Sequence, residues 1–109
     1  MDNEITHVYN EINNVWDVKL SGEFDIFNSS VLKDALNTII GEKQACLCID
    51  CESLHYMDST SIGVLVSVLK CVKAYDGVVA LKNLKPNLVK LFRITNLNKV
   101  FEIEGEADE

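Results

Sequence analysis

The sequence predicts an α/β domain in which a mixed β-sheet begins with an antiparallel hairpin and continues as alternating strands and helices. Two strand-like runs near the N-terminus are separated by Asn13-Asn14, a plausible hairpin turn. From residue 29 onward, segments with helical periodicity alternate with short apolar runs. Such alternation implies parallel neighbouring strands joined by crossover helices. The 109 residues are enough for a single domain over 1–109.

The hairpin is predicted from two runs of different strength. Residues 5–10 give a weak strand pattern, whereas in residues 15–20 apolar and polar side chains alternate, as in a half-exposed strand. We expect the following Ser21-Gly22 pair to break the second strand.

A first helix is predicted over residues 29–40. Its apolar side chains recur at helical spacing and define a single face. Asn28 is a suitable N-cap residue, and Gly41 is a suitable stop at the C-terminal end.

Residues 45–49 are apolar without alternation, which is typical of a strand buried on both faces of a helix-covered parallel sheet. A second helix is predicted over about 60–75, ended by Asp76-Gly77. Residues 78–81 form another apolar strand, after which Pro86 occupies the first position of a third helix. Val100, Phe101 and Ile103 add a short last strand or pack as an extended tail.

The charge pattern excludes several kinds of partner. The net charge is −7, and the last eight residues contain five acids, namely Glu102, Glu104, Glu106, Asp108 and Glu109. Since no basic stripe offsets them, we expect no direct binding of nucleic acid, and we interpret residues 104–109 as a solvated acidic tail. The chain shows neither a signal peptide pattern nor an apolar stretch of membrane-spanning length, so we expect a cytoplasmic protein that does not enter a membrane.

Three of the four cysteines lie close together, which raises the possibility of a metal site. On a strand, however, Cys46 and Cys48 point to one face and Cys51 points to the other or lies past the strand end. Zinc ligands are usually paired across a turn, and His55 would have to supply a fourth ligand from an irregular spacing. We therefore predict that these cysteines and Cys71 are packed in the core, with no metal and no cofactor bound.

The segment 58–63, Asp-Ser-Thr-Ser-Ile-Gly, lies between the buried strand and the second helix. Asp and Ser are common N-caps, so a purely structural role could explain one of them. The loops that follow parallel strands are also where ligands and partners bind, and the start of a helix favours an added phosphate. The residues alone leave capping and a functional role equally open.

The same segment resembles the phosphorylation motif of the bacterial anti-sigma factor antagonists, Asp-Ser-[Ser/Thr]-Gly-[Leu/Ile]-Gly. These are small proteins built on the STAS domain. Residues 20–25, Leu-Ser-Gly-Glu-Phe-Asp, are similar to the family's Gly-Glu-Leu-Asp segment before its first helix. The region from Leu84-Lys85-Pro86 through 89–92 to Asn96-Leu97 is similar to its third-helix segment. The resemblance covers nearly the whole chain in order and spacing.

This resemblance implies a regulatory role without enzymatic activity or catalytic residues. In the family, the unphosphorylated antagonist binds an anti-sigma factor, a serine kinase of the histidine-kinase-like ATPase type, and so frees a sigma factor. The kinase phosphorylates the first serine of the motif, here Ser59, and a metal-dependent serine phosphatase removes the phosphate. We expect the free antagonist to be a monomer.

The resemblance also implies a partner-binding surface, made of Asp25, Asp58, Ser59, Thr60, Ser61, Ile62 and Gly63. Ser61 stands where the family motif commonly has glycine. It could act as an N-cap or as a second phosphate acceptor, and Thr60 is the other second choice.

Three other interpretations compete with this one. A STAS domain can instead serve as a scaffold or as a module of a sensory complex. A phosphorelay receiver could use Asp50, but it needs five parallel strand-helix units and an acidic pair after the first strand. A serine hydrolase could use Ser59 and His55, but the Gly-x-Ser-x-Gly elbow is absent, and His55 is better explained as a loop residue.

Overall fold

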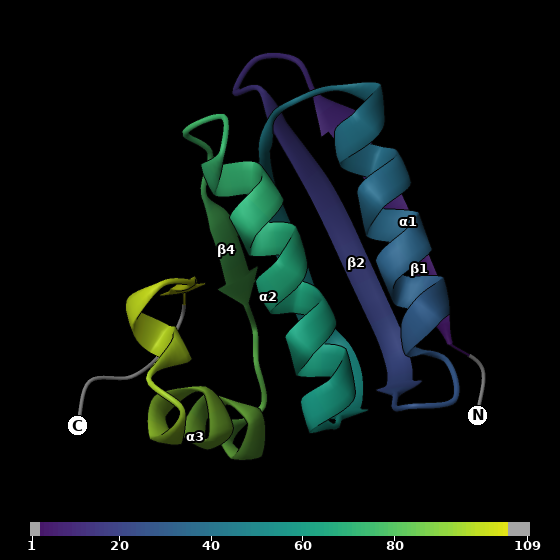
Figure 1. The fold of residues 1–109 in the computed structure, drawn as a ribbon, viewed down its shortest axis with the longest axis vertical. Helices are drawn as coiled ribbons and strands as arrows, with labels where there is room; N and C mark the ends of the chain where they lie inside the picture. The colour runs from purple at the N-terminus through teal and green to yellow at the C-terminus, as the bar shows by residue number, and fades with distance from the viewer. Residues whose placement is uncertain (1–2, 105–109) are drawn as a thin grey trace.

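The computed structural model describes residues 3–104, which form one five-stranded sheet of order β1-β2-β3-β4-β5 with its helices (Figure 1). In chain order the elements are β1 (Glu4–Asn10), β2 (Val15–Phe24), α1 (Ser29–Glu42), β3 (Cys46–Met57), α2 (Ser59–Lys73), β4 (Val79–Lys82), α3 (Pro86–Ile94), the 3-10 helix η1 (Leu97–Lys99) and β5 (Glu102–Glu104). β1 pairs with β2 antiparallel, and the remaining neighbours pair in parallel. The predicted fold class is confirmed, and the last segment is a strand.

The hairpin turn lies where the sequence predicts it. Asn14 adopts a left-handed φ of 56°, which asparagine tolerates better than most residues. The side-chain oxygen of Asn10 accepts hydrogen bonds from the backbone N–H groups of Ile12 and Asn13, at 3.1 and 3.2 Å. The turn is therefore held by local asparagine contacts.

The predicted break at Ser21-Gly22 is wrong, because β2 continues to Phe24. Gly22 has a φ of 92°, and the register with β3 shifts on either side of it. A glycine that permits a bulge lets the strand resume after an irregularity. Because β2 is longer than predicted, the chain after residue 50 has a strand to pair with, and the last pair is Phe24 with Met57. β3 therefore extends through His55, which is an exposed strand residue and not a loop residue as predicted.

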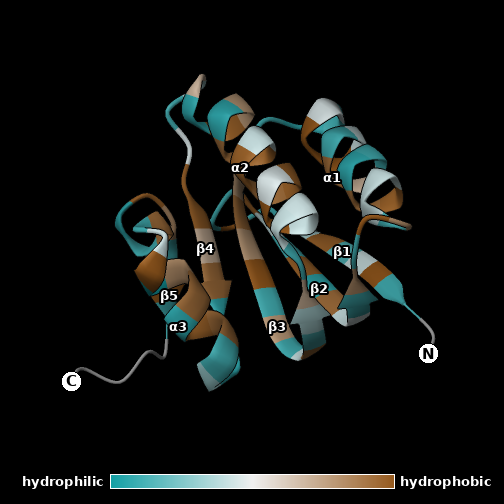
Figure 2. Cartoon of the chain, turned by 60° about the horizontal axis from the view of Figure 1, so that its bottom comes forward, coloured by the Kyte–Doolittle hydropathy of each residue, from teal (hydrophilic) through white to brown (hydrophobic). Residues whose placement is uncertain are grey.

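The helices cover the sheet from one side, which corrects the prediction that residues 45–49 are buried on both faces. α1 and α2 lie over the same face of the sheet (Figure 2). Leu47 and Ile49 are buried beneath them, whereas Cys46 and Cys48 are half-buried on the opposite face. There they line a cavity of about 350 Å³ together with Asp17 and other residues of the sheet.

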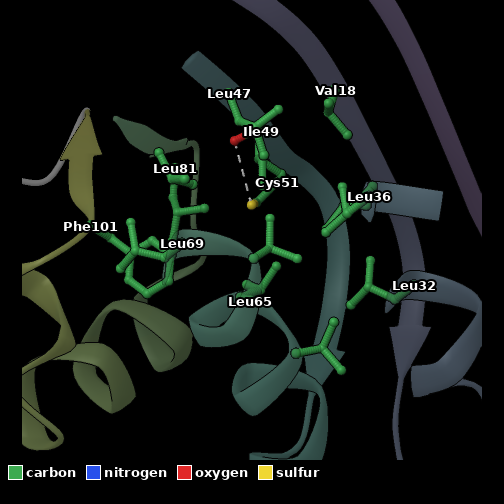
Figure 3. Close-up of a cluster of buried hydrophobic side chains, with 14 of the residues drawn as sticks. Val18, Leu32, Leu36, Leu47, Ile49, Cys51, Leu65, Leu69, Leu81 and Phe101 are labelled. Atoms are coloured by element: carbon green, nitrogen blue, oxygen red, sulfur yellow. Dashed lines mark hydrogen bonds between the residues drawn. The ribbon is translucent and has the colours of Figure 1, made fainter. Parts of the chain in front are cut away.

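The hydrophobic core lies between the sheet and the helices (Figure 3). Cys51 is 1% exposed in it, as predicted, and its thiol lies 3.7 Å from the carbonyl oxygen of Ile49. Phe92 of α3 meets Phe101 edge to face, with ring centroids 5.6 Å apart, which closes the core beside β4. Cys71 is exposed on the outer side of α2, so its predicted core position is wrong.

The two long helices end differently. α2 ends as predicted: Asp76 has a φ of 65°, and the N–H of Gly77 donates to the carbonyl of Val72 at 2.9 Å. A Cβ atom on Gly77 would lie 2.6 Å from Cγ1 of Val72, so any side chain here would force the buried Val72 to shift. Gly41 is not the predicted stop, because α1 runs through it to Glu42 and leaves the helix through an extended Lys43.

No helix among residues 3–104 has the length and apolarity that a membrane crossing requires. Apart from Glu104, the predicted acidic tail lies outside the described residues.

Candidate functional site

The candidate site lies where β3 ends and α2 begins. Asp58 has extended backbone angles and is the N-cap of α2. Its Oδ1 accepts a hydrogen bond from the backbone N–H of Ser61 at 2.9 Å, and its carbonyl accepts from the N–H of Ile62 at 3.0 Å. Because Asp58 fills the capping role, the hydroxyls of Ser59 and Thr60 are not needed for it.

The same aspartate also holds a second segment, the turn between β2 and α1. Its Oδ2 accepts a hydrogen bond from the backbone N–H of Ile26 at 3.0 Å, and its own N–H donates to the carbonyl of Phe24 at 3.1 Å. One carboxylate therefore joins two segments 32 residues apart. Both segments lie at the same end of the molecule, at the bottom of Figure 1.

The turn at residues 25–28 is fixed by its own hydrogen bonds. Oδ1 of Asp25 accepts from the N–H of Phe27 at 2.9 Å, and Oδ1 of Asn28 accepts from the N–H of Asp25 at 2.8 Å. The side-chain amide of Asn28 donates to the carbonyl of Glu23 at 2.9 Å. Asn28 occupies the N-cap position, as predicted, but its side chain makes no capping hydrogen bond and stabilises the turn.

The residues of the motif divide between the surface and the core. Ser59, Thr60 and Gly63 are exposed, whereas Ser61 is 0% and Ile62 7% exposed. Within residues 3–104 the Ser61 hydroxyl, which is fully buried, finds no hydrogen-bond partner. Ser61 and Ile62 thus lie beneath the predicted partner-binding surface, whereas Asp25 and Asp58 are half-buried at its edge.

His55 and Asp50, the residues on which the hydrolase and receiver interpretations depend, do not form a catalytic or phosphoacceptor site. His55 is an exposed residue of β3, and Ser59 is an exposed residue in the first turn of α2. Asp50 accepts hydrogen bonds from the Asn83 side chain and the Glu52 N–H, both at 3.0 Å. Partial burial acts to raise the pKa of Asp50, but these bonds and nearby lysines outweigh it and lower the pKa. Asp50 thus has a structural environment on the open face of the sheet.

No group of three or more His, Cys, Asp or Glu side chains among residues 3–104 is arranged to hold a metal ion. The cysteines of β3 accordingly offer no ligand set, since Cys51 lies on the face opposite to Cys46 and Cys48. The prediction that the chain binds no metal is open to elemental analysis, and one zinc per chain would overturn it.

An apolar group beside the site was not predicted from the sequence. Phe27 is 91%, Ile26 64% and Val31 60% exposed, and Tyr56 at the end of β3 is half-exposed. A signal was present: Ile26-Phe27 follows the end of β2 and precedes α1, and it belongs to neither pattern of buried residues. Large apolar side chains in a turn are candidates for contact with a partner.

Comparisons with known proteins agree with this architecture. The model of the STAS domain family matches residues 7–109. The anti-sigma-B factor antagonist of Bacillus subtilis is 36% identical over 91 residues, which cover 84% of this chain and 83% of that protein.

Solved structures show the same fold. An anti-sigma factor antagonist from Mycobacterium paratuberculosis superimposes with a TM-score of 0.74 at 21% identity, over 96% of this chain and 89% of that one. The unphosphorylated form of the anti-sigma factor antagonist SpoIIAA gives a TM-score of 0.72 at 19% identity, over 97% and 90% of the two chains. The phosphorylated form of SpoIIAA, from Bacillus, gives 0.69 at 20% identity, over 96% and 93%. The chain belongs to the STAS domain family and, within it, to the anti-sigma factor antagonists.

Proposed function

We propose that this antagonist, when unphosphorylated, binds an anti-sigma factor that is a serine kinase, and that phosphorylation of Ser59 ends the binding. Release of a sigma factor for transcription follows from the binding. The observation that carries the proposal is the state of Ser59: it is exposed in the first turn of α2, while Asp58 supplies the cap. Its hydroxyl is accessible to a kinase and dispensable for the fold.

Burial selects among the possible phosphate acceptors. Ser61 is 0% exposed, so a kinase cannot reach it without opening the start of α2. Thr60 is exposed and remains the second choice. We therefore assign the phosphate to Ser59 and exclude Ser61 as an acceptor in the folded protein.

Electrostatics explains how a phosphate can act as a switch without unfolding the domain. A phosphoserine adds nearly two negative charges. Within the domain, the N-terminus of α2 favours this charge, which offsets part of the repulsion from Asp58. A partner surface shaped for a hydroxyl gains no such compensation. Phosphorylation thus blocks docking and leaves the fold intact.

The remaining parts of the proposal concern the surroundings of the switch. A serine phosphatase restores the free hydroxyl, and the chain itself performs no catalysis. The kinase and the sigma factor act in the cytoplasm, so we place the antagonist there, as a monomer when free. An acidic surface with a net charge of −7 fits a protein partner better than DNA.

Kinase binding by three proteins tests the assignment. Ser59→Ala should stay folded, bind the kinase and resist phosphorylation, since the lost hydroxyl costs less than about 1 kcal/mol where it does not cap. Ser59→Asp should fold equally well but bind at least about tenfold more weakly, because it places a charge in the interface. Calorimetry measures the affinities, and circular dichroism verifies the fold.

Thr60→Ala is the matched control, since it removes the neighbouring exposed hydroxyl. It should be phosphorylated like the wild type. Equal affinities for all variants, with phosphate mapped to Thr60, would refute the assignment of Ser59. Failure of every form to bind a kinase would favour the scaffold interpretation.

A further inference from the structure

We infer that Cys46 and Cys48 form a dithiol site for a trivalent organoarsenical, which bonds to both sulfurs and places its organic group in the cavity on the open face of the sheet. The inference is independent of the proposed function. β3 begins at Cys46 and ends at Met57, so the pair lies at the end of this strand away from Ser59.

The two thiols lie side by side on one strand. Residues two apart in a strand point to the same face, with Cα atoms about 6.7 Å apart. Cys46 and Cys48 are accordingly both half-buried on the face that α1 and α2 leave open, where both line the cavity of about 350 Å³ (Figure 2). Sγ of Cys46 accepts a hydrogen bond from the backbone N–H of Val78 at 3.3 Å. Cys51 lies in the core and Cys71 on the outer side of α2, so neither can join the pair.

The spacing of the pair favours a bridging atom over a direct bond. A Cα separation of about 6.7 Å is near the upper end of the range of about 4.4–6.8 Å that disulfides span. An S–S bond of about 2.0 Å would therefore strain the strand, and both cysteines are free in the structure. An arsenic atom bonded to both sulfurs leaves them farther apart. Once one sulfur is bonded, the second reacts intramolecularly, so the chelate is stronger than a single bond.

The protonation state of the pair suits an arsenical better than zinc. Burial raises the pKa of the Cys48 thiol; Lys82 acts against this shift, and carboxylates such as Glu104 act with it. Zinc binds thiolates, whereas an arsonous acid condenses with protonated thiols. Asp17, Glu102 and Glu104 line the same cavity, so they disfavour an anionic ligand but accept a neutral arsonous acid.

The condensation is balanced without an oxidant or a reductant. At each sulfur an S–H bond and an As–O bond break, an As–S bond forms, and the proton leaves with the hydroxyl group as water. Two such steps convert the arsonous acid and the dithiol into the chelate and two waters. Arsenic stays trivalent, and neither sulfur is oxidised.

The cavity provides room for the organic group. Its lining includes the apolar side chains of Val15, Val78 and Ala80. Val15 pairs with Cys46 between β2 and β3, and Ala80 pairs with Cys48 between β3 and β4. A volume of about 350 Å³ falls within the range of about 300–1,000 Å³ that is usual for small-molecule sites. A phenyl group should therefore bury apolar surface that a methyl group cannot.

Binding of phenylarsine oxide, which hydrates to phenylarsonous acid, tests the site. Native mass spectrometry of the full chain should show one arsenical per chain, in an adduct that survives a large excess of 2-mercaptoethanol. Cys46→Ser and Cys48→Ser should each lose this resistant adduct, because a single As–S bond exchanges with the monothiol. Cys71→Ser is the matched control and should keep it. Retention of the resistant adduct in Cys46→Ser or Cys48→Ser would overturn the inference.

A second measurement needs no variant. The wild-type adduct is unfolded in urea and treated with iodoacetamide, and the modified cysteines are mapped by mass spectrometry. Cys51 and Cys71 should be alkylated, whereas Cys46 and Cys48 should be protected. Alkylation of Cys46 and Cys48 to the same extent as the other two would contradict the chelate.

The place of the organic group is tested by comparing phenyl and methyl arsenicals. In the folded protein, the dithiothreitol concentration that removes half of the arsenical should be about tenfold higher for the phenyl compound, because the cavity buries the ring. In urea the two concentrations should be equal to those for a short peptide with the same cysteine spacing. Equal release of both compounds from the folded protein, relative to that peptide, would refute the role of the cavity.

Discussion

The Asp58 carboxylate shows how little of a motif can be assigned from residue types alone. Asp, Ser and Thr are all good N-caps, so the sequence 58–61 offers several residues for one structural task. In the structure Asp58 takes that task with one oxygen and holds the Ile26 N–H with the other. The second contact could not be predicted, because it depends on a tertiary arrangement that brings a distant turn to the helix start.

Ser61 provides a prediction at the same scale. Its hydroxyl is fully buried and, within residues 3–104, lacks a hydrogen-bond partner, which costs stability. Ser61→Ala removes that hydroxyl and introduces a better helix former, so the free energy of unfolding should rise by about 1 kcal/mol. Urea denaturation measures it, and kinase affinity should not change.

The exposed neighbour provides the control for this measurement. Thr60→Ala should change the free energy of unfolding by no more than about 0.5 kcal/mol. A loss of stability in Ser61→Ala would show that the hydroxyl has a partner, such as a bound water, and would contradict the prediction.

At the scale of the elements, the existence of β1 to β4 and of α1 to α3 could be predicted from the sequence pattern, whereas η1 was not predicted, β5 was one of two alternatives, and several boundaries were missed. β2 and β3 are longer than predicted because each supplies the other with hydrogen-bond partners past Gly22. Gly22 looks like a strand breaker when only its local preference is considered. The C-terminal end of α2 was predictable, since Asp76-Gly77 combines a left-handed residue with a close backbone approach.

The cysteines of β3 and α2 allow the positions of these elements to be tested. Burial raises the pKa of the Cys51 thiol to about 12, so the thiolate is scarce at neutral pH. Cys71 is exposed on the outer side of α2. Iodoacetamide at pH 8 should therefore label Cys71 first and leave Cys51 unlabelled until the protein unfolds, as mapped by mass spectrometry.

Cys71→Ser should remove the fast phase of this labelling. Native-state labelling of Cys51 at the rate of Cys71 would show that the core around β3 opens readily, contrary to the structure.

The molecule as a whole is one-sided in two respects. α1 and α2 cover one face of the sheet, while Cys46 and Cys48 line a cavity on the other face. The apolar run 45–49 suggested cover on both faces because cysteine is ambiguous: it packs as a small hydrophobe and is also tolerated at partial exposure. The parts of the candidate site are likewise gathered at one end, where β2 and β3 finish.

This concentration predicts how the domain responds to phosphorylation. The proposed acceptor, Ser59, is exposed and lies beside a cap that Asp58 already satisfies, so a phosphate there should leave the remainder of the sheet and its core unchanged. Amide hydrogen exchange of the Ser59-phosphorylated and unmodified proteins should differ only near residues 58–62 and 26–28. Altered exchange in β4 or α3 would indicate that phosphorylation refolds the domain, and it would contradict the proposal that the phosphate only blocks docking.

The shared carboxylate of Asp58 also limits how the hexapeptide 58–63 can be transplanted. One of the two carboxylate oxygens of Asp58 accepts a hydrogen bond from the N–H of Ile26, and the other accepts from the N–H of Ser61. A peptide of residues 58–63 does not contain Ile26. A synthetic peptide or a foreign loop carrying 58–63 would keep the Ser59 hydroxyl but lose the turn held beside it. Under the proposed function, an engineered substrate would therefore need both segments in their folded arrangement, and the linear motif alone would not define one.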